Sequence, residues 1–267
     1  HTGDIIKLPS TAYRDTSQAP YEPGFPEAHP EWATVKSPEW LNDTSNYNNR
    51  GNSTFSGESA LLGDFNGNDD LDTSQQDVID GWIDIYKHWI ETYKVDGFRI
   101  DTVKHVDIEL WQQFSPQILD FAKQQGIPNF SMFGEVAEAA PEETSYYTST
   151  GQLPSALDFS IRGATRDVFS RGVGTSQLAG VFEADDLYNA AHTDARSITN
   201  FLDNHDQGRW GTFLKDDDAS RTDDDLVARS VVSAAAITFS RGAPVFYYGF
   251  EQGFTGNGES DTQARQD

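Results

Sequence analysis

Residues 95–101 read Val-Asp-Gly-Phe-Arg-Ile-Asp, a short and largely apolar stretch that ends on a carboxylate. Residues 75–94, immediately before it, carry large apolar side chains at helical spacing, which predicts an amphipathic helix. The apolar stretch itself is predicted to be a strand, with Asp101 at its carboxyl end. A helix followed by a short strand is the repeating element of an alternating α/β chain.

The same alternation continues toward the carboxyl terminus. Helices are predicted over 107–125, 162–170 and 222–240, and further strands over 129–135, 155–161, 197–203 and 244–249. Alternating strands and helices of this kind form a parallel sheet with right-handed crossover connections. The fold class is therefore α/β.

Residues 3–73 have a different texture. They are rich in Gly, Pro, Asn, Asp, Ser and Thr and show little periodicity. A long irregular segment next to a regular fold is usually a functional insertion. We therefore divide the chain into a loop-rich domain at 1–73 and an alternating α/β portion at 74–267.

The charge balance restricts the partners. The chain has 43 acidic and 19 basic side chains, a net charge of −24, which argues against a nucleic-acid partner or an anionic membrane. No apolar run reaches transmembrane length, and the absence of cysteine excludes disulfides and thiolate metal sites. The acidic runs at 216–218 and 223–225 predict a solvated loop and a helix start. A neutral polymer such as a polysaccharide fits this balance.

Three carboxylates fall where a parallel sheet would bring them together. Asp101 and Glu135 end the first two predicted strands, and Asp206 lies just past the fourth. A lone acid at a strand end is more often a helix cap or a solvated turn, but three in succession favour a site. Carboxyl ends of strands in parallel barrels carry the chemistry, and cleavage of a glycosidic bond needs a carboxylic acid beside a carboxylate.

Three segments in this chain carry a family resemblance. GFRIDTVKH at 97–105, FGEV at 133–136 and FLDNHD at 201–206 resemble three consecutive signature regions of the α-amylase family of glycoside hydrolases, in the same order. The resemblance covers essentially the whole chain. It implies a (β/α)8 TIM barrel, present here from about strand four to strand eight and truncated at both ends. It also implies that the loop-rich domain is inserted after the third strand.

The resemblance implies a role for each signature residue. Asp101 would be the nucleophile, Glu135 the general acid and then the general base, and Asp206 a ligand of the sugar hydroxyls that favours the oxocarbenium-like state. Arg99, two residues before the nucleophile on the same strand face, would hold it ionised through a charge-assisted hydrogen bond. His205 would bind the same sugar.

Other substrate-binding residues follow from the same resemblance. Lys104 and His105 extend the first motif as in α-amylases proper, where the pair lines the leaving-group side of the cleft; a Lys-His pair that merely begins a helix is the alternative. His1 resembles the end of a further signature and would be a sugar-binding histidine. Asp261 and Arg265 match an acid–arginine pair on the non-reducing side of the cleft.

A calcium ion is implied by residues 61–73, LLGDFNGNDDLDT, which resemble the family's calcium-binding segment. Asp64 is the candidate ligand, with the backbone carbonyl of His105 as a second, and oxygen ligands suit this hard cation. The run Asn-Asp-Asp-Leu at 68–71 departs from the Pro-Asp-Leu-like run of the family. An Asn/Asp-rich turn without metal is the alternative.

The sequence thus predicts a retaining, endo-acting hydrolase of α-1,4 bonds in starch- or glycogen-type glucans. An α-glucosidase, a maltogenic exo-amylase or a glucanotransferase would share the chemistry. A non-catalytic carbohydrate-binding relative would typically have lost one of the three acids, all of which are present. The expected partner is an α-glucan polysaccharide or oligosaccharide, and the protein is expected to be monomeric. Secretion is expected because polymeric starch is met outside the cell, with a cytoplasmic glycogen-degrading role as the alternative.

Overall fold

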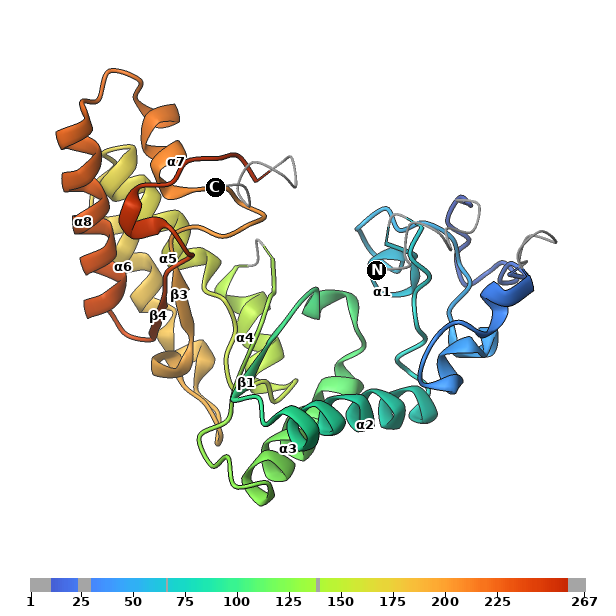
Figure 1. The fold of residues 1–267 in the computed structure, drawn as a ribbon. Coiled ribbons are helices and arrows are strands. Elements are labelled where there is room, and N and C mark those ends of the chain that lie inside the picture. The colour runs from blue at the N-terminus through green and yellow to red at the C-terminus, as the bar shows by residue number, and fades with distance from the viewer. Residues whose placement is uncertain (1–10, 24–29, 66, 138–139, 259–267) are drawn as a thin grey trace. The chain divides into compact units, whose positions relative to one another are not determined.

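The computed structural model describes residues 11–23, 30–65, 67–137 and 140–258 (Figure 1). The chain forms two compact units: the first holds the residues up to Asp96 together with Val103–Phe130, and the second holds Gly97–Thr102 together with the residues from Ser131 onward. The α-helices are α1 (Ser59–Leu62), α2 (Gln76–Tyr93), α3 (Ile108–Gln124), α4 (Pro141–Ser149), α5 (Phe159–Thr165), α6 (Ser176–Glu183), α7 (Trp210–Asp217) and α8 (Asp223–Phe239).

The second unit is built on parallel strands. The strands are β1 (Gly97–Ile100), β2 (Ser131–Gly134), β3 (Thr199–Phe201) and β4 (Ala243–Val245). β1 pairs with β2 and β3 pairs with β4, both in parallel. Single parallel bridges at Ala156 and Leu157 join β2 to β3, so the order along the chain is also the order across the sheet. This arrangement confirms the parallel α/β prediction.

The strand predictions are confirmed in position but not in length. Three of the observed strands lie inside the predicted ranges, and β4 begins one residue before its predicted range and ends early. The predicted strand at 155–161 is wrong beyond Leu157. The side chain of Asp158 accepts a hydrogen bond of 2.8 Å from the Ile161 nitrogen, and this N-cap begins α5.

The predicted helices at 75–94, 107–125 and 222–240 correspond to α2, α3 and α8. α8 begins with a capping box formed by Thr222 and Asp225, which confirms the predicted helix start. The helix predicted at 162–170 is α5 followed by a π-helical turn, Arg166–Ser170. The solvated loop predicted at 216–218 is wrong, because α7 continues to Asp217. α4, α6 and α7 were not predicted.

One hydrophobic cluster of the second unit joins the segment that follows β3 to α7 and α8. Its buried members are Leu202, Trp210, Phe213, Leu214 and Ile237. Phe201 of β3 packs against Phe159 with ring centroids 5.0 Å apart. The residues that lead out of β3 toward the predicted third acid are therefore anchored in packed structure.

The first unit combines irregular backbone with a helix pair. α2 packs on α3 (Figure 1). The rings of Tyr86 and Phe114 lie 4.8 Å apart in an edge-to-face contact. The irregular part contains α1 and the short 3-10 helices Pro30–Thr34, Glu39–Asn42 and Thr44–Asn46. The helices α2 and α3 belong to the same compact unit as the loop-rich segment. The domain boundary predicted after residue 73 therefore stays a prediction.

Helices able to cross a membrane are absent from the described ranges, since none is both long enough and apolar enough.

Candidate functional site

The first two predicted acids meet at the carboxyl ends of paired strands. The Glu135 nitrogen donates a 2.7 Å hydrogen bond to the Ile100 oxygen, so each acid directly follows the last paired residues of its strand. Gly97 permits this close approach at the other end of β1, because a Cβ atom there would lie 2.3 Å from the Ser131 oxygen. The sheet register thus places Asp101 beside Glu135.

Arg99 lies at the centre of the site. Its side chain points to the same side of β1 as Asp101, since residues two apart in a strand share a face. Its Nη1 donates to Asp101 Oδ1, and its Nη2 lies 3.3 Å from Glu135 Oε1 and 3.9 Å from Asp206 Oδ2. His205 Nε2 lies 3.1 Å from Asp206 Oδ2. The structure therefore brings together five of the predicted site residues within one unit, and their roles remain predictions.

A tight turn presents Asp206 and His205. The Asn204 side-chain oxygen accepts hydrogen bonds from the nitrogens of Asp206 (3.0 Å) and Gln207 (2.6 Å). Gly208 closes the turn with φ of +89°, in the left-handed region that favours glycine. Because this turn lies beyond the end of β3, the third acid follows its strand by several residues.

The two neighbouring carboxyl groups have pKa values displaced in opposite directions. Burial raises the pKa of Glu135, and its hydrogen bond and repulsion with Asp101 raise it further, against the opposing charge of Arg99. Burial alone would raise the pKa of Asp101 as well, but hydrogen bonds from Arg99 and Glu135 outweigh burial and lower it. The surroundings therefore favour protonation of Glu135 and ionisation of Asp101. This is the arrangement that an acid and a nucleophile require.

Thr102 contributes a backbone group that the sequence did not reveal. Its nitrogen donates a 3.3 Å hydrogen bond to Glu135 Oε2, and its φ is +51°. A β-branched residue in the left-handed region is strained, and such strain is concentrated at functional sites. The strained residue immediately follows Asp101, so it orients the two acids with respect to each other.

Lys104 and His105 lie in the first unit, in a 3-10 helix Val103–His105. His105 Nδ1 lies 2.7 Å from the Ala60 oxygen, and the imidazole packs edge-to-face on Phe55 and Phe65. Their predicted position on the leaving-group side stays a prediction. The remaining predicted substrate-binding residues, His1, Asp261 and Arg265, lie outside the described residues.

The predicted calcium segment contains one buried carboxylate, Asp64, and a partly buried one, Asp70. Asp64 is 5% exposed, and its oxygens accept hydrogen bonds from the Asp70 nitrogen (3.2 Å) and the Tyr21 hydroxyl (3.4 Å). Burial raises the pKa of Asp70 to about 8, although Asn48 donates a 2.7 Å hydrogen bond to it. Within the described residues, no three His, Asp or Glu side chains are arranged as a metal site. The sequence pointed to Asp64 and missed Asp70, which lies in the run that departs from the family pattern.

The fold and the site together define the catalytic domain of a glycoside hydrolase, with carboxyl groups gathered at the carboxyl ends of parallel strands. The chain belongs to the α-amylase family: the model of the family's catalytic domain, described as "Alpha amylase, catalytic domain", matches residues 1–267.

Individual relatives agree with this membership. The chain is 45% identical over 252 residues to an α-amylase of Streptomyces lividans, covering 94% of this chain and 27% of the relative. It is 31% identical over 243 residues to a cyclomaltodextrin glucanotransferase of Bacillus sp. (strain 6.6.3), covering 85% of this chain and 29% of the relative. The chain thus spans little more than a quarter of the length of these curated relatives.

Solved structures show the same fold. The α-amylase of Geobacillus thermoleovorans, solved in complex with acarbose, superimposes with a TM-score of 0.71 at 24% identity, over 85% of this chain and 49% of that one. An α-amylase of Malbranchea cinnamomea gives a TM-score of 0.67 at 22% identity, over 84% of this chain and 43% of that one. The chain therefore has the fold of the TIM-barrel α-amylase catalytic domain over the compared part.

Proposed function

We propose that the full-length protein hydrolyses internal α-1,4 bonds of starch- or glycogen-type glucans with retention of configuration. The observation that carries this proposal is the pairing of Asp101 with Glu135 around Arg99, which favours ionisation of Asp101 and protonation of Glu135. Glu135 would protonate the glycosidic oxygen while Asp101 attacks the anomeric carbon, and Glu135 would then deprotonate the incoming water.

Retention is supported by how close the two carboxyl groups lie. Both contact the guanidinium of Arg99, Asp101 through Nη1 and Glu135 through Nη2. Inverting glycosidases hold their carboxyl groups about 6.5–9.5 Å apart to admit a water, whereas retaining enzymes hold them about 5–5.5 Å apart. Two carboxyl groups that contact one guanidinium fit the shorter separation.

The glucanotransferase alternative keeps the same chemistry and changes the acceptor. Its support is the 31% identity to a cyclomaltodextrin glucanotransferase, against 45% to an α-amylase. Lys104 and His105 would bind the leaving-group side of the glucan in either enzyme. The higher identity and the longer coverage favour hydrolysis. A non-catalytic relative is disfavoured, because the three acids and Arg99 form one connected site.

The test uses the full-length protein and a maltoheptaoside with a blocked non-reducing end and a chromophore at its reducing end. Release of short labelled fragments, with the α-anomer as the first product by NMR, is expected for a retaining endo-amylase. Cleavage of the unblocked analogue alone would indicate an exo-acting enzyme or an α-glucosidase. Cyclic products or longer glucans would indicate a transferase, and cleavage of neither substrate would overturn the proposal.

We also propose a structural calcium ion in the first unit. Asp64 and Asp70 fit this group because Asp64 is buried and Asp70 partly buried, both supply hard oxygen donors, and a 3.2 Å hydrogen bond links them. The Asp70 carboxylate, which burial disfavours in its ionised form, would be stabilised by a divalent cation. The backbone carbonyl of His105, in the same unit, would be a further ligand. The ion would supply stability and no chemical step.

Calcium removal is expected to destabilise the protein. A chelator should lower the melting temperature, and calcium at about a hundred times its Kd should restore roughly 2.7 kcal/mol of unfolding free energy. Asp70→Asn should abolish this calcium dependence, whereas Asp72→Asn, a neighbouring substitution of the same kind, should preserve it. Differential scanning fluorimetry with and without calcium measures the melting temperatures of the wild type and the two variants. An equal response of wild type and Asp70→Asn to the chelator would contradict the assignment.

We infer that the protein acts outside the cell as a monomer, since starch is a polymer too large to enter cells. The heavily acidic surface, with a net charge of −24, is compatible with a dispersed secreted enzyme. Amylase activity in the culture medium would support this location, and activity confined to the cell extract would favour the cytoplasmic alternative.

A further inference from the structure

Arg209 directly follows the turn that carries His205 and Asp206, and its side chain is completely buried. Its guanidinium lies 4.2 Å from the ring centroid of Tyr247 and 4.4 Å from that of Tyr248, and it donates a hydrogen bond to the Tyr248 oxygen. A buried charge is costly unless its surroundings compensate it, and here aromatic ring faces, a carbonyl and the buried carboxylate of Asp203 do so. The arginine thus fixes the segment after β4 to the turn after β3.

Tyr247 connects this arginine to the candidate catalytic residues. Its ring centroid lies 6.3 Å from that of His205, with an interplanar angle of 43°. His205 Nε2 in turn lies 3.1 Å from Asp206 Oδ2. A continuous series of contacts therefore runs from Arg209 through one ring to the imidazole and the third acid.

The backbone on both sides of Arg209 is held as well. Its nitrogen donates a 2.9 Å hydrogen bond to the Gly256 oxygen, and the Trp210 nitrogen donates one of 3.0 Å to Asp203 Oδ2. A Cβ atom at Gly208 would lie 3.1 Å from the Gly256 oxygen, so the two segments pack closely there. The backbone at Arg209 is consequently held, and the guanidinium extends from a constrained position to the rings of Tyr247 and Tyr248.

We propose that Arg209 is a positioning residue, which holds Tyr247 against His205 and thereby fixes Asp206 beside Arg99. This inference rests on the proposed function, because positioning matters only where the acids act on a substrate. The planar guanidinium is essential to it. An ammonium group is a point charge on a flexible stem and cannot stack on two rings while also donating to a carbonyl.

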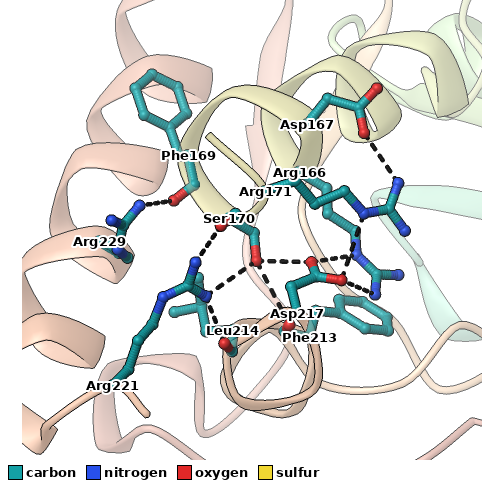
Figure 2. A network of polar contacts seen from close by, with 10 residues as sticks. All are labelled: Arg166, Asp167, Phe169, Ser170, Arg171, Phe213, Leu214, Asp217, Arg221 and Arg229. Atoms are coloured by element: carbon teal, nitrogen blue, oxygen red, sulfur yellow. Dashed lines mark hydrogen bonds and ion pairs between the residues drawn. The ribbon is translucent and has the colours of Figure 1, made fainter. Parts of the chain in front are cut away.

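Arg209→Lys is expected to lower kcat on maltoheptaoside roughly 10- to 100-fold, the effect of a small misplacement of a catalytic group. KM should change by less than about threefold, because the acid acts mainly in the transition state. The matched control is Arg221→Lys, the same change at another buried arginine, which donates to the carbonyls of Leu214 and Ser170 (Figure 2). The control should lower the melting temperature and leave kcat unchanged.

A second pair of variants does not depend on the folding of Arg209→Lys. Tyr247→Leu removes the ring and should lower kcat to a similar extent, whereas Tyr247→Phe keeps the ring and should recover most of the loss. The double variant Arg209→Lys/Tyr247→Leu should lose no more activity than the worse single variant, since both act through one contact. Additive losses, or an unchanged kcat with a lower melting temperature, would overturn the inference.

A readout without turnover separates this inference from the proposed function. The ring-proton NMR resonances of His205, assigned with a His205→Gln variant, sense the ring current of Tyr247. They should move in Arg209→Lys and Tyr247→Leu and stay in place in Arg221→Lys. Unmoved resonances refute the positioning contact even if the enzyme is active, whereas a wild type inactive on every glucan refutes the proposed function alone.

Discussion

Replacing Asp101 with asparagine is expected to lower kcat on maltoheptaoside by about four orders of magnitude or more, as loss of a nucleophile does in other covalent mechanisms. The amide is isosteric with the carboxylate but cannot form the glycosyl-enzyme intermediate. Steady-state kinetics with the full-length protein measure the loss. The matched control is Asp194→Asn, because Asp194 is also paired with an arginine two residues away, Arg196, at a site on the surface. The control should keep kcat within about twofold.

Replacement of the acid–base residue Glu135 is expected to give a different pattern of activity. Glu135→Gln should lose activity on maltoheptaoside but still react with α-maltosyl fluoride, because fluoride leaves without protonation. Asp101→Asn should react with neither substrate. The two variants together therefore assign the roles of the two carboxyl groups. Undiminished turnover of maltoheptaoside by Asp101→Asn would show that Asp101 is not the nucleophile. If Glu135→Gln lost turnover of the fluoride while Asp101→Asn kept it, the roles of the two residues would be the reverse of those proposed.

The parts of the fold that local sequence determines could be predicted. Apolar residues at helical spacing located α2 and α3, whose buried side chains follow that period. The helix α8 and the cores of the strands were also located, although Val227 and Val231 of α8 are exposed. The strand predicted to end at residue 161 shows the limit of this reasoning. An apolar alternation continued through Phe159 and Ile161, but the Asp158 side chain caps a helix there. This cap is a single side-chain hydrogen bond, which the apolar periodicity of the sequence does not reveal.

The candidate site was predictable to the extent that it lies on motif residues at strand ends. Arg99, Asp101 and Glu135 follow from two adjacent strands, whose pairing brings them together. The supports of the site were not predictable. Arg209 contacts Tyr248, 39 residues away, and the π-helical turn that ends α5 contacts α7 across 51 residues. Long-range contacts of this kind leave no local pattern, because each partner alone resembles an ordinary charged residue.

Asp217 is the clearest case of a residue whose sequence context misleads. It belongs to an acidic run that predicts a solvated loop, yet its side chain is 10% exposed and lies at the centre of an arginine network (Figure 2). Its carboxylate accepts two hydrogen bonds of 2.9 Å from Arg166, one of 2.7 Å from Ser170 and one of 3.3 Å from Arg171. The network joins the π-helical turn to the end of α7.

The surrounding arginines complete this junction. Arg221 donates to the carbonyls of Ser170 and Leu214, and Arg229 donates a 2.6 Å hydrogen bond to the Phe169 carbonyl. The carbonyl groups at the end of a helix have no partners within it, and here side chains from outside the helix supply them. Asp217 balances the positive charge that these guanidinium groups bring into the interface.

Asp217→Ala is therefore expected to lower the free energy of unfolding by about 3 kcal/mol, at the lower end of the range for breaking a buried ion pair, since Arg171 is partly exposed. Differential scanning calorimetry of the full-length protein measures the loss. The matched control is Asp167→Ala, which removes a different and more exposed carboxylate from the same Arg171, 2.9 Å away. The control should cost no more than about 0.5 kcal/mol, and equal losses in the two variants would contradict a special role for Asp217.

The pH dependence of the same pair of proteins gives an independent test. Burial alone would raise the pKa of Asp217, but hydrogen bonds from Arg166 and Ser170 outweigh it and lower the pKa to about 2. A carboxyl group with a lowered pKa in the folded state contributes stability above its unfolded pKa of about 3.9 and loses it as the pH falls toward the folded pKa. The stability difference between wild type and Asp217→Ala should therefore be constant above about pH 5 and shrink between about pH 4 and pH 2. A difference that persists undiminished at pH 2 would mean that packing, and not the charge of Asp217, holds the junction between the π-helical turn and α7.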